Sequence, residues 1–369
     1  MQPLSIHIVS FDVPYPADYG GVIDVFWRIV FLSKVGVKIH LHCFYDKRIP
    51  SEELEKYCEK VYYYPRKLNF ISLFKGLPYI VSSRINNGLI KNLKKDDFPI
   101  LLEGLHTCGI IPFLKGRKIA VRMHNIESDY YRKLGEAETR FFYRFYNFIE
   151  AFLLKRFEKI LKEVDMIWAI SPQDTAVLYE KYPQTAYLPA FHPDDEVRVG
   201  EGLGEGCLYH GNLSVAENHL AAMFLVETLK DHFPFIIAGK NPRPELYTAA
   251  QKYKKVNIIK NPSEKEMKDL IARAQVHVLP TFQQTGIKLK LLNVLFNGRH
   301  IIVNPEMVSD QDLSELCTII KNESDWISII QQKMNQYIDE IEIKKRSNIL
   351  KNFNPKMNAE IIKQWLSID

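Results

Sequence analysis

The sequence predicts a soluble α/β protein of two doubly wound domains, in which parallel sheets carry helices on both faces. Three observations support this fold class. The chain has 369 residues, which is too long for one ordinary core and favours two domains of about 180 residues. Its composition, 46% hydrophobic and 25% charged, is typical of globular proteins. Short apolar, β-branched runs alternate with longer amphipathic stretches along the whole chain.

Six strands are predicted in the first half of the chain. They are the apolar runs at residues 6–10, 38–44, 60–64, 100–103, 118–122 and 166–170. Between them, amphipathic stretches such as 22–35 and 143–163 predict helices. The segment SPQD at 171–174 is typical of a helix start, because it offers a Ser cap, Pro at the first helical position and an acid in the first turn.

A linker is predicted where this alternation lapses, in PAFHPDDEVRVGEGLGEG at 189–206, which is rich in Pro, Gly and acids. The alternation then restarts, with strands predicted at 207–210, 235–238, 256–259, 276–279, 300–303 and 317–320. We therefore expect one domain at 1–190 and a second at 191–354. Ligands of such sheets bind at the carboxyl ends of the strands, so the loops that follow the strands are the places to search.

Charge and cysteine usage exclude several classes of function. The net charge of +5 permits an anionic ligand or a membrane surface, but it is too small for the dense basic patch of a nucleic-acid-binding protein. The five cysteines are scattered without CxxC spacing, which favours reduced thiols and no metal site. We also predict neither a signal peptide nor a membrane span, because no apolar run approaches about 20 residues.

Two loops in the first half carry residues suited to ligand contacts. In FDVPYPADYGGV, Gly20 and Gly21 directly precede a predicted helix, where they let a ligand approach the backbone and offer N–H groups to an anion. In LLEGLHTCG, Glu103 and His106 lie at and just beyond a strand end, a combination that suits hydroxyl binding or acid–base chemistry. A plain loop and solvated side chains are the alternatives.

A third loop, VRMHNIESDYY, carries four hydrogen-bonding side chains within six residues. They are Arg122, His124, Asn125 and Glu127. This density at the end of a predicted strand indicates a functional loop, although His124 could also be a hydrogen-bonded core histidine.

The segment TFQQTGIKLKLLNVLFNGRHIIVN at 281–304 opens a predicted helix, 287–296, with two lysines. The macrodipole disfavours cations at a helix start, so Lys288 and Lys290 indicate a bound anion there. Backbone amides at the Gly286 turn would hold phosphate, and the ammonium groups would add charge. About 200° separates the two lysines on a helix, so we expect Lys288, which is nearer the turn, to face the ligand. Two solvated lysines are the alternative.

Six segments, in this order, carry a resemblance to a known family. They are PADYGG, RMHNIES, DMIWAISPQD, YHGNLSVAENHLAA, IIAGKNP and VLPTFQQTGIKLKLLNVLFNGRHIIV, and they span residues 16–303. The chain resembles a divergent retaining glycosyltransferase of the GT-B fold, from the large group that includes bacterial polysaccharide mannosyl- and glucosyltransferases. The resemblance implies two Rossmann-like domains facing across a cleft. It also implies hexosyl transfer from a UDP- or GDP-linked sugar to a glycan or lipid-linked hydroxyl, with no metal or cofactor.

The resemblance also implies roles for individual residues. Contacts to the donor sugar and diphosphate during catalysis are expected from His124, Lys240 and Lys288. The other donor-binding positions are Gly211, Asn212, Asn261, Thr285, Gly286, Ile287 and Asn293. The acceptor side and its loops comprise Tyr19, Gly20, Gly21, Glu103, His106 and Asn125. The last helix of such enzymes returns to the first domain, so residues 355–369 are expected to pack there through Trp365.

Departures from the family pattern point to a divergent branch. Two glutamates eight positions apart are usual, and here those places hold Thr285 and Asn293. Asn212 and Glu217 stand where the family often has an Arg–Lys pair for the phosphates. These departures keep two other functions open: a catalytically degenerate GT-B protein that binds a nucleotide or partner, and a sugar-nucleotide epimerase, which shares the two-domain fold.

Two aromatic and basic stretches bear on membranes. TRFFYRFYNFIEAFLLKRFEKILKE carries Phe141, Phe145, Phe148, Phe152 and Leu153 near helical spacing, and we predict a core-facing helix with a solvated back. YYYPRKLNFISLFKGLPYIV lies in the domain where a lipid-linked acceptor would dock. Peripheral membrane contact through Arg66, Lys67 and residues 70–75 is therefore a hypothesis for a cytoplasmic enzyme at the inner face of the membrane.

Overall fold

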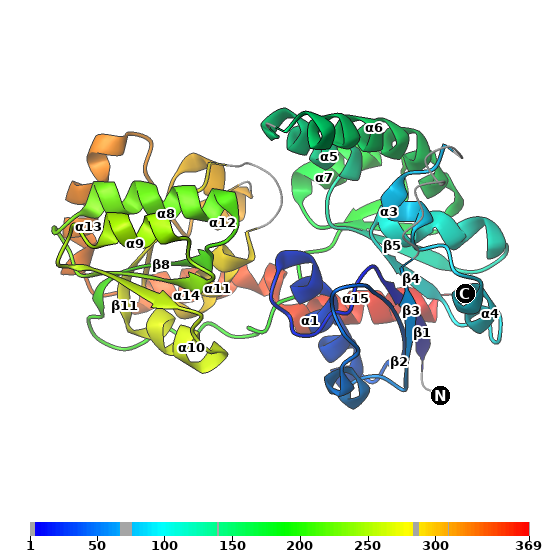
Figure 1. The fold of residues 1–369 in the computed structure, drawn as a ribbon. Helices are drawn as coiled ribbons and strands as arrows, with labels where there is room; N and C mark the ends of the chain where they lie inside the picture. Colours follow the sequence, from blue (N-terminus) through cyan, green and yellow to red (C-terminus); the bar gives the residue numbers. More distant parts are fainter. Residues whose placement is uncertain (1–3, 67–75, 139, 283–287, 309, 369) are drawn as a thin grey trace. The chain divides into compact units, whose positions relative to one another are not determined.

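The computed structural model describes residues 4–66, 76–138, 140–282, 288–308 and 310–368, and the chain divides into two compact units (Figure 1). The N-terminal unit comprises Met1–Pro193 and Pro355–Asp369, and the C-terminal unit comprises Asp194–Asn354. The sequence placed the domain boundary between residues 190 and 191 and assigned 355–369 to the first domain.

The N-terminal unit is built on a seven-stranded parallel sheet of order β3-β2-β1-β4-β5-β6-β7. Its strands are β1 Ser5–Ser10, β2 Lys38–Tyr45, β3 Lys60–Pro65, β4 Ile100–Glu103, β5 Ile119–Met123, β6 Met166–Ala169 and β7 Thr185–Tyr187. Its helices are α1 Gly20–Lys34, α3 Tyr79–Ser82, α4 Asn87–Leu93, α5 Glu127–Ala137, α6 Phe141–Phe157, α7 Pro172–Tyr179 and α15 Pro355–Ser367. The predicted strands are present, and β7, only three residues long, is the strand that the sequence did not predict.

The C-terminal unit has a six-stranded parallel sheet of order β10-β9-β8-β11-β12-β13. Its strands are β8 Glu205–Asn212, β9 Phe235–Lys240, β10 Val256–Lys260, β11 Ala274–Leu279, β12 His300–Val303 and β13 Thr318–Ile319. Its helices are α8 Ala216–Leu229, α9 Pro244–Ala250, α10 Glu264–Arg273, α11 Leu289–Asn297, α12 Gln311–Ser314, α13 Trp326–Met334 and α14 Glu340–Leu350. All six strands agree with the prediction.

Short 3-10 helices complete the described chain. They are η1 Glu52–Lys56, η2 Leu105–Phe113, η3 Glu158–Glu163, η4 Pro305–Met307, η5 Glu323–Asp325 and η6 Lys351–Phe353. None of the helices in the described ranges is long and apolar enough to cross a membrane.

Both faces of the N-terminal sheet are buried, which is why its strands are almost continuously apolar. Ile6 and Ile8 of β1 pack into one core cluster, whereas Val9 packs into a second cluster on the other face. The first cluster includes Trp365 of α15, whose ring meets Trp168 edge-on at 5.4 Å between centroids. The final helix thus contributes to the core of the unit in which the chain began.

Each sheet has one point where the strand order reverses direction. In the N-terminal unit this switch point lies between β1 and β4, and in the C-terminal unit it lies between β8 and β11. Successive crossovers leave these points in opposite directions, so the loops at the carboxyl ends of the two strands part and leave room for a ligand.

The prediction that the aromatic stripe of α6 faces the core is wrong. Phe141, Phe145, Phe148 and Phe152 are exposed, and of the five stripe residues Leu153 alone is buried. The other side of the helix carries its own apolar residues, including Ala151 and Leu154, and it is this side that is buried.

The other stretch considered for membranes is only partly described. Lys67 and residues 70–75 lie outside the described residues. Arg66 lies 5.8 Å from the centroid of the Tyr79 ring and 3.9 Å from a carboxylate oxygen of Asp46. The proposed lipid contact at this stretch therefore stays a prediction.

Candidate functional site

Helix α1 begins at the Gly-Gly pair, close to the switch point of the N-terminal sheet. Tyr19 is its N-cap residue, makes no side-chain cap and is followed by no acid in the first turn. The Tyr19 hydroxyl instead donates to Asp12 at 3.1 Å. A Cβ at Gly21 would lie 2.9 Å from the ring of Phe11, so glycine lets this aromatic ring pack on the backbone. Gly20 is exposed with open space beside it, as a ligand-facing backbone requires.

Five ionisable side chains, which we call the Asp24 cluster, gather at the same switch point. They are Asp24, Arg28, Glu103, Arg122 and His124. Nη2 of Arg28 donates to Asp24 at 3.0 Å and to Glu103 at 2.7 Å. Arg122 donates to both oxygens of Asp24, at 3.0 and 3.1 Å. All four of these charged side chains are fully buried.

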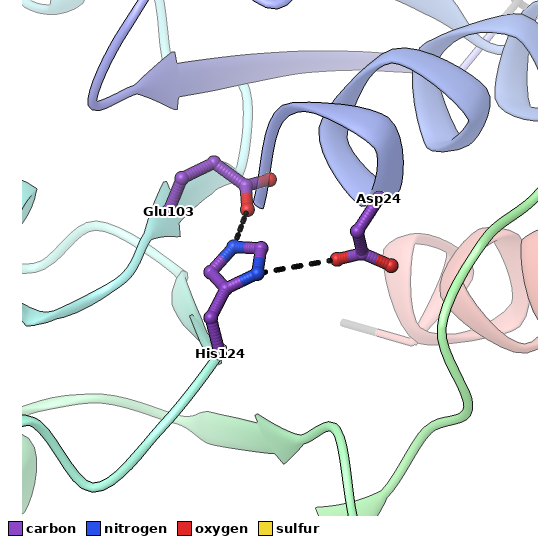
Figure 2. Close-up of side chains that lie close together, drawn as sticks. All are labelled: Asp24, Glu103 and His124. Carbon is purple, nitrogen blue, oxygen red and sulfur yellow. Dashed lines mark hydrogen bonds and ion pairs between the residues drawn. The ribbon is translucent and has the colours of Figure 1, made fainter. Parts of the chain in front are cut away.

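Figure 2 shows His124 between the two carboxylates of the Asp24 cluster. Nε2 of His124 lies 3.0 Å from Glu103 Oε2, so the carboxylate accepts and this nitrogen carries the proton. Nδ1 lies 3.7 Å from Asp24 Oδ2 and makes no hydrogen bond among the described residues. Burial alone raises the pKa of Asp24, but Arg122 and Arg28 outweigh it and hold that pKa well below its ordinary value. The cluster therefore fixes the orientation of the imidazole.

The same cluster has the donor set of a metal site but an unfavourable charge balance. Single ligand atoms of Asp24, Glu103 and His124 all lie within 4.8 Å of one another. However, Asp24 Oδ2 and Glu103 Oε2 already accept from Arg28 and Arg122, and two carboxylates with two guanidinium groups sum to zero. A divalent cation would have to displace or sit beside these fixed positive charges. The arrangement favours an ion-pair framework over metal binding.

Several predicted residues of the N-terminal unit lie close to this framework. Glu103 has no exposed surface in this structure. Its assignment to the side that binds the acceptor substrate stays a prediction. Nδ1 of His106 lies 3.8 Å from the carboxylate of Glu127. Burial lowers the pKa of His106 well below its ordinary value, and burial raises the pKa of Glu127 to about 8. Asn125 is half-buried between His124 and the start of α5.

Sequence reasoning missed Asp24 and Arg28. The available signal was the pair of charges, four residues apart, within the otherwise apolar run GGVIDVFWRIVFL. An acid and a base at this spacing share one helix face, and here that face is buried. Arg122 was predicted at the end of a strand in a functional group with His124, and the structure places it inside β5, fully buried as the partner of Asp24.

A second group, which we call the Lys288 cluster, lies at the switch point of the C-terminal sheet. Its members are Tyr209, Glu217, Asn218, Thr281, Lys288 and Lys290. Nζ of Lys288 lies 2.9 Å from Glu217 Oε1, which also accepts from the Thr281 hydroxyl. Nζ of Lys290 donates to Asn218 Oδ1 at 2.8 Å and lies 4.9 Å from the centroid of the Tyr209 ring.

The predicted opposition of the two lysines is wrong, because the helix starts later than predicted. Helix α11 begins at Leu289, and Lys288 is its N-cap residue in an extended conformation. Both ammonium groups consequently reach the start of α8, one at Glu217 and the other at Asn218. Burial lowers the pKa of Lys290 to about 8. Burial raises the pKa of Glu217, but hydrogen bonds from Thr281 and Lys288 outweigh this and lower it.

The remaining donor-side predictions lie at the carboxyl ends of neighbouring strands. A Cβ at Gly239 would lie 1.8 Å from the carbonyl oxygen of Gly211, so β8 and β9 can approach here only with glycine. The Asn212 carbonyl accepts from the side chain of Asn218 at 3.0 Å. The next strand end has Asn261, whose side chain accepts from a backbone amide at 2.7 Å.

Lys240 and Asn293 complete the described donor-side predictions. Lys240 is the exposed last residue of β9. Asn293, half-buried in α11, accepts from the side-chain amide of Asn297 at 3.2 Å. Thr285, Gly286 and Ile287 lie outside the described residues.

Comparison with known proteins identifies the architecture. No protein-family model matches the chain. An uncharacterized 44.6 kDa protein in the cps region of Klebsiella pneumoniae is 28% identical over 325 residues, which cover 80% of this chain and 82% of that protein. The apo form of the lipopolysaccharide outer core galactosyltransferase WaaB matches with a TM-score of 0.63 at 12% identity, covering 98% of this chain and 100% of that one. The fold is GT-B.

A second solved GT-B structure, HepE of Anabaena in complex with UDP and glucose, matches with a TM-score of 0.63 at 10% identity over 99% of each chain. At such low identity the likeness concerns the fold alone. Within this GT-B chain, the Asp24 cluster and the Lys288 cluster each occupy the switch point of one of the two sheets.

Proposed function

We propose that this GT-B protein is a retaining hexosyltransferase that moves a sugar from a nucleoside-diphosphate donor to a hydroxyl of a glycan or lipid-linked acceptor. The observation that carries the proposal is the convergence of Lys288 and Lys290 on the start of α8, where they outnumber the single carboxylate of Glu217. A surplus of ammonium charge at a switch point suits a diphosphate. The cps-region relative supports polysaccharide biosynthesis as the proposed setting, and a cytoplasmic location is part of the proposal.

The proposed chemistry needs the lysines at the leaving group. The acceptor oxygen forms a bond to the anomeric carbon on the face from which the diphosphate departs, and the carbon–oxygen bond to the diphosphate breaks. The bonding electrons leave with the diphosphate, and the acceptor proton passes to one of its oxygens. Lys288 and Lys290 stabilise the negative charge that develops there. Lys240 and the turn at Gly286 stay proposed as further contacts to the diphosphate.

His124 is proposed to contact the transferred sugar. Its imidazole is already held by Glu103 and lies near Asp24, so a sugar hydroxyl would meet a polar group with a fixed orientation. UDP is the first nucleotide to test, because HepE is described with UDP and glucose.

One observation favours a second candidate, a GT-B protein that binds nucleotide without turnover. Lys288 Nζ forms an ion pair with Glu217 Oε1 at 2.9 Å, so a diphosphate has to compete with this carboxylate for the lysine. If the ion pair between Glu217 and Lys288 persists when the diphosphate binds, Lys288 contributes less to diphosphate affinity than an unpaired lysine would.

The two candidates are separated by measuring binding and turnover on the same preparations. We expect UDP or GDP to raise the melting temperature by mass action, and Lys288→Ala to weaken that nucleotide about tenfold or more. Lys252→Ala is the matched control, since Lys252 also pairs with a glutamate of this unit but lies on the surface. Release of nucleoside diphosphate from the sugar donor then reports turnover.

The outcomes differ for each candidate. Binding that depends on Lys288 together with turnover supports transfer, and such binding without turnover supports the second candidate. Unchanged affinity in Lys288→Ala contradicts both. Conversion of the donor into an epimer would instead indicate a sugar-nucleotide epimerase.

A further inference from the structure

The solvent-facing side of α6 carries an unusual number of aromatic rings. Phe142 is 84% exposed, Phe141 74%, Phe152 61% and Phe145 59%, while Phe148 and Ile149 are each 36% exposed. At about 100° per residue these six side chains fall within an arc of about 120° on one side of the helix. We call this surface the α6 aromatic face. Contiguous exposed apolar surface of this kind on a folded protein marks a contact with something else.

The side of α6 opposite the aromatic face already packs against the N-terminal unit, so the aromatic face is not the side through which the helix joins the core. Figure 1 shows α6 running alongside α5 in the N-terminal unit. Glu150 on the packed side is fully buried, and its carboxylate accepts from the amides of Tyr79 at 3.0 Å and Ile80 at 2.8 Å. Leu153 and Leu154 are buried beside it. These contacts hold the helix in the one orientation that turns its aromatic rings outwards.

The charges on the exposed part of α6 are all of one sign. Arg144, Lys155 and Arg156 are exposed, whereas the one acid of the helix, Glu150, is buried on the other side. Arg144 lies 5.8 Å from the centroid of the Phe148 ring, and Arg156 lies 5.9 Å from that of Phe152. Cationic groups are thus interleaved with the rings instead of forming a separate patch.

We propose that the α6 aromatic face docks on a membrane surface that contains anionic phospholipids. The rings enter the headgroup region, and Arg144, Lys155 and Arg156 bind the lipid phosphates. Helix α6 has 17 residues and a packed inner side, so it lies in the plane of the interface and does not cross the bilayer. A second copy of this chain is a poor occupant, because pairing two such faces brings arginines and lysines together. This inference does not rest on the proposed sugar transfer.

Co-sedimentation of the full chain with vesicles tests the proposal. Vesicles of phosphatidylcholine with phosphatidylglycerol are compared with vesicles of phosphatidylcholine alone, at low and high salt. We expect binding to the anionic vesicles that weakens with salt. The triple variant Phe141→Ser, Phe145→Ser, Phe152→Ser should lower the partition coefficient at least tenfold. The charge reversals Arg144→Glu, Lys155→Glu and Arg156→Glu, combined in one chain, should do the same.

The matched control replaces equally exposed apolar side chains elsewhere. Tyr179, Tyr337 and Ile341 are 57%, 64% and 80% exposed, and their triple serine variant should bind vesicles as the wild type does. Thermal unfolding checks that each variant is folded. If the aromatic variant fails to fold, the charge-reversal variant carries the test, because it leaves every ring in place.

Several results would overturn the proposal. These are no binding of the wild type to anionic vesicles, equal binding to neutral vesicles, or unchanged binding of both triple variants. A dimer in analytical ultracentrifugation that the aromatic variant dissociates, without vesicle binding by the wild type, would make the face an interface between copies.

Discussion

The two sheets of this protein use the same topological position in different ways. At the switch point of the N-terminal sheet, two carboxylates face two guanidinium groups, all fully buried and balanced in charge. At the switch point of the C-terminal sheet, two lysines lie near one carboxylate. The side chains of Lys288 and Glu217 are 13% and 18% exposed. A balanced and closed cluster serves as a framework. An unbalanced and partly open cluster has charge left for a ligand.

This contrast indicates where the proposed anion site is to be sought. A switch point alone does not mark a ligand site, because the two carboxylates of the Asp24 cluster are balanced by its two guanidinium groups. The surplus charge of the Lys288 cluster, two lysines against one glutamate, is what distinguishes it. Loss of a cation should therefore have opposite effects in the two clusters. Removing Arg122 from the Asp24 cluster should destabilise the protein, whereas removing Lys290 from the Lys288 cluster should stabilise the ligand-free protein.

The largest effect is expected at Arg122. Arg122→Leu leaves Asp24 with one guanidinium partner and removes the donor to the backbone carbonyls of Leu188 and Pro189. Breaking a buried pair from one side should cost about 4 kcal/mol of the free energy of unfolding. Urea unfolding followed by tryptophan fluorescence measures it, since Trp27, Trp168 and Trp365 lie in the N-terminal unit and only Trp326 lies in the other.

Two further variants bracket the Arg122 result. Arg122→Lys keeps the charge but not the two parallel contacts, so an intermediate loss is expected. Arg132→Leu breaks an exposed pair with Glu136 and should change little. A loss in Arg122→Leu no greater than that in Arg132→Leu would show that the Asp24 cluster is no framework.

A smaller effect is expected at Glu127, whose pKa burial raises to about 8 and which lies near Arg84, Asp174 and His106. In the unfolded chain a glutamate titrates near about 4.3, so between these values the folded state holds a proton that the unfolded state has lost. Stability therefore falls as pH rises from about 4.3 to 8. Glu127→Gln removes this fall and should be more stable than the wild type by about 3 kcal/mol at pH 8.

Urea unfolding at pH 5 and pH 8 provides this measurement. The advantage of Glu127→Gln should be small at pH 5 and grow towards pH 8. An advantage that does not change with pH would mean that the carboxyl is already ionised in the folded protein.

The smallest effect on stability is expected at Lys290, and like that of Glu127→Gln it is opposite in sign to the effect of Arg122→Leu. Burial lowers the pKa of Lys290 to about 8, below about 10.4 in the unfolded chain, so keeping it charged near neutral pH costs stability. Lys290→Met should stabilise the ligand-free protein by about 2 kcal/mol at pH 7, after the lost hydrogen bond to Asn218 is allowed for. The same variant should weaken nucleoside diphosphate about tenfold.

The pH dependence of binding sharpens the Lys290 prediction. In the wild type, diphosphate affinity measured by calorimetry should fall as pH rises from 7 to 9, because Lys290 loses its charge. In Lys290→Met that fall should be reduced. A variant that is less stable than the wild type yet binds with equal affinity would contradict the assignment of Lys290 to the anion site.

Strand positions were predictable because buried parallel strands are short, continuous apolar runs bounded by turns. The three-residue strand β7 is too short for such a pattern. The position of the lysines depended on where α11 begins, and helix ends are the least certain feature of a sequence pattern. A start at Leu289 instead of 287 turns two opposed lysines into two converging ones.

Two other features depend on tertiary packing that a sequence pattern does not carry. Helix α6 is apolar on both sides, so its periodicity could not indicate which side is buried. In the sequence, Asp24 and Arg28 have the spacing of an exposed ion pair on a helix surface. Only the fold shows that Glu103 of β4 and Arg122 of β5 pair with them in the interior. Both cases show that a helix face is defined by its partner.

The final helix has a consequence for how the protein is made. Ala359, Ile362, Trp365 and Leu366 of α15 complete a core that also contains Ile6 and Ile8, which are synthesised before the whole of the C-terminal unit. The continuous segment Asp194–Asn354 emerges in full before α15 does. The half of the protein that is synthesised first is thus the half that finishes folding last. Until α15 has emerged from the ribosome, the core surface that it will cover stays available to chaperones or to wrong partners.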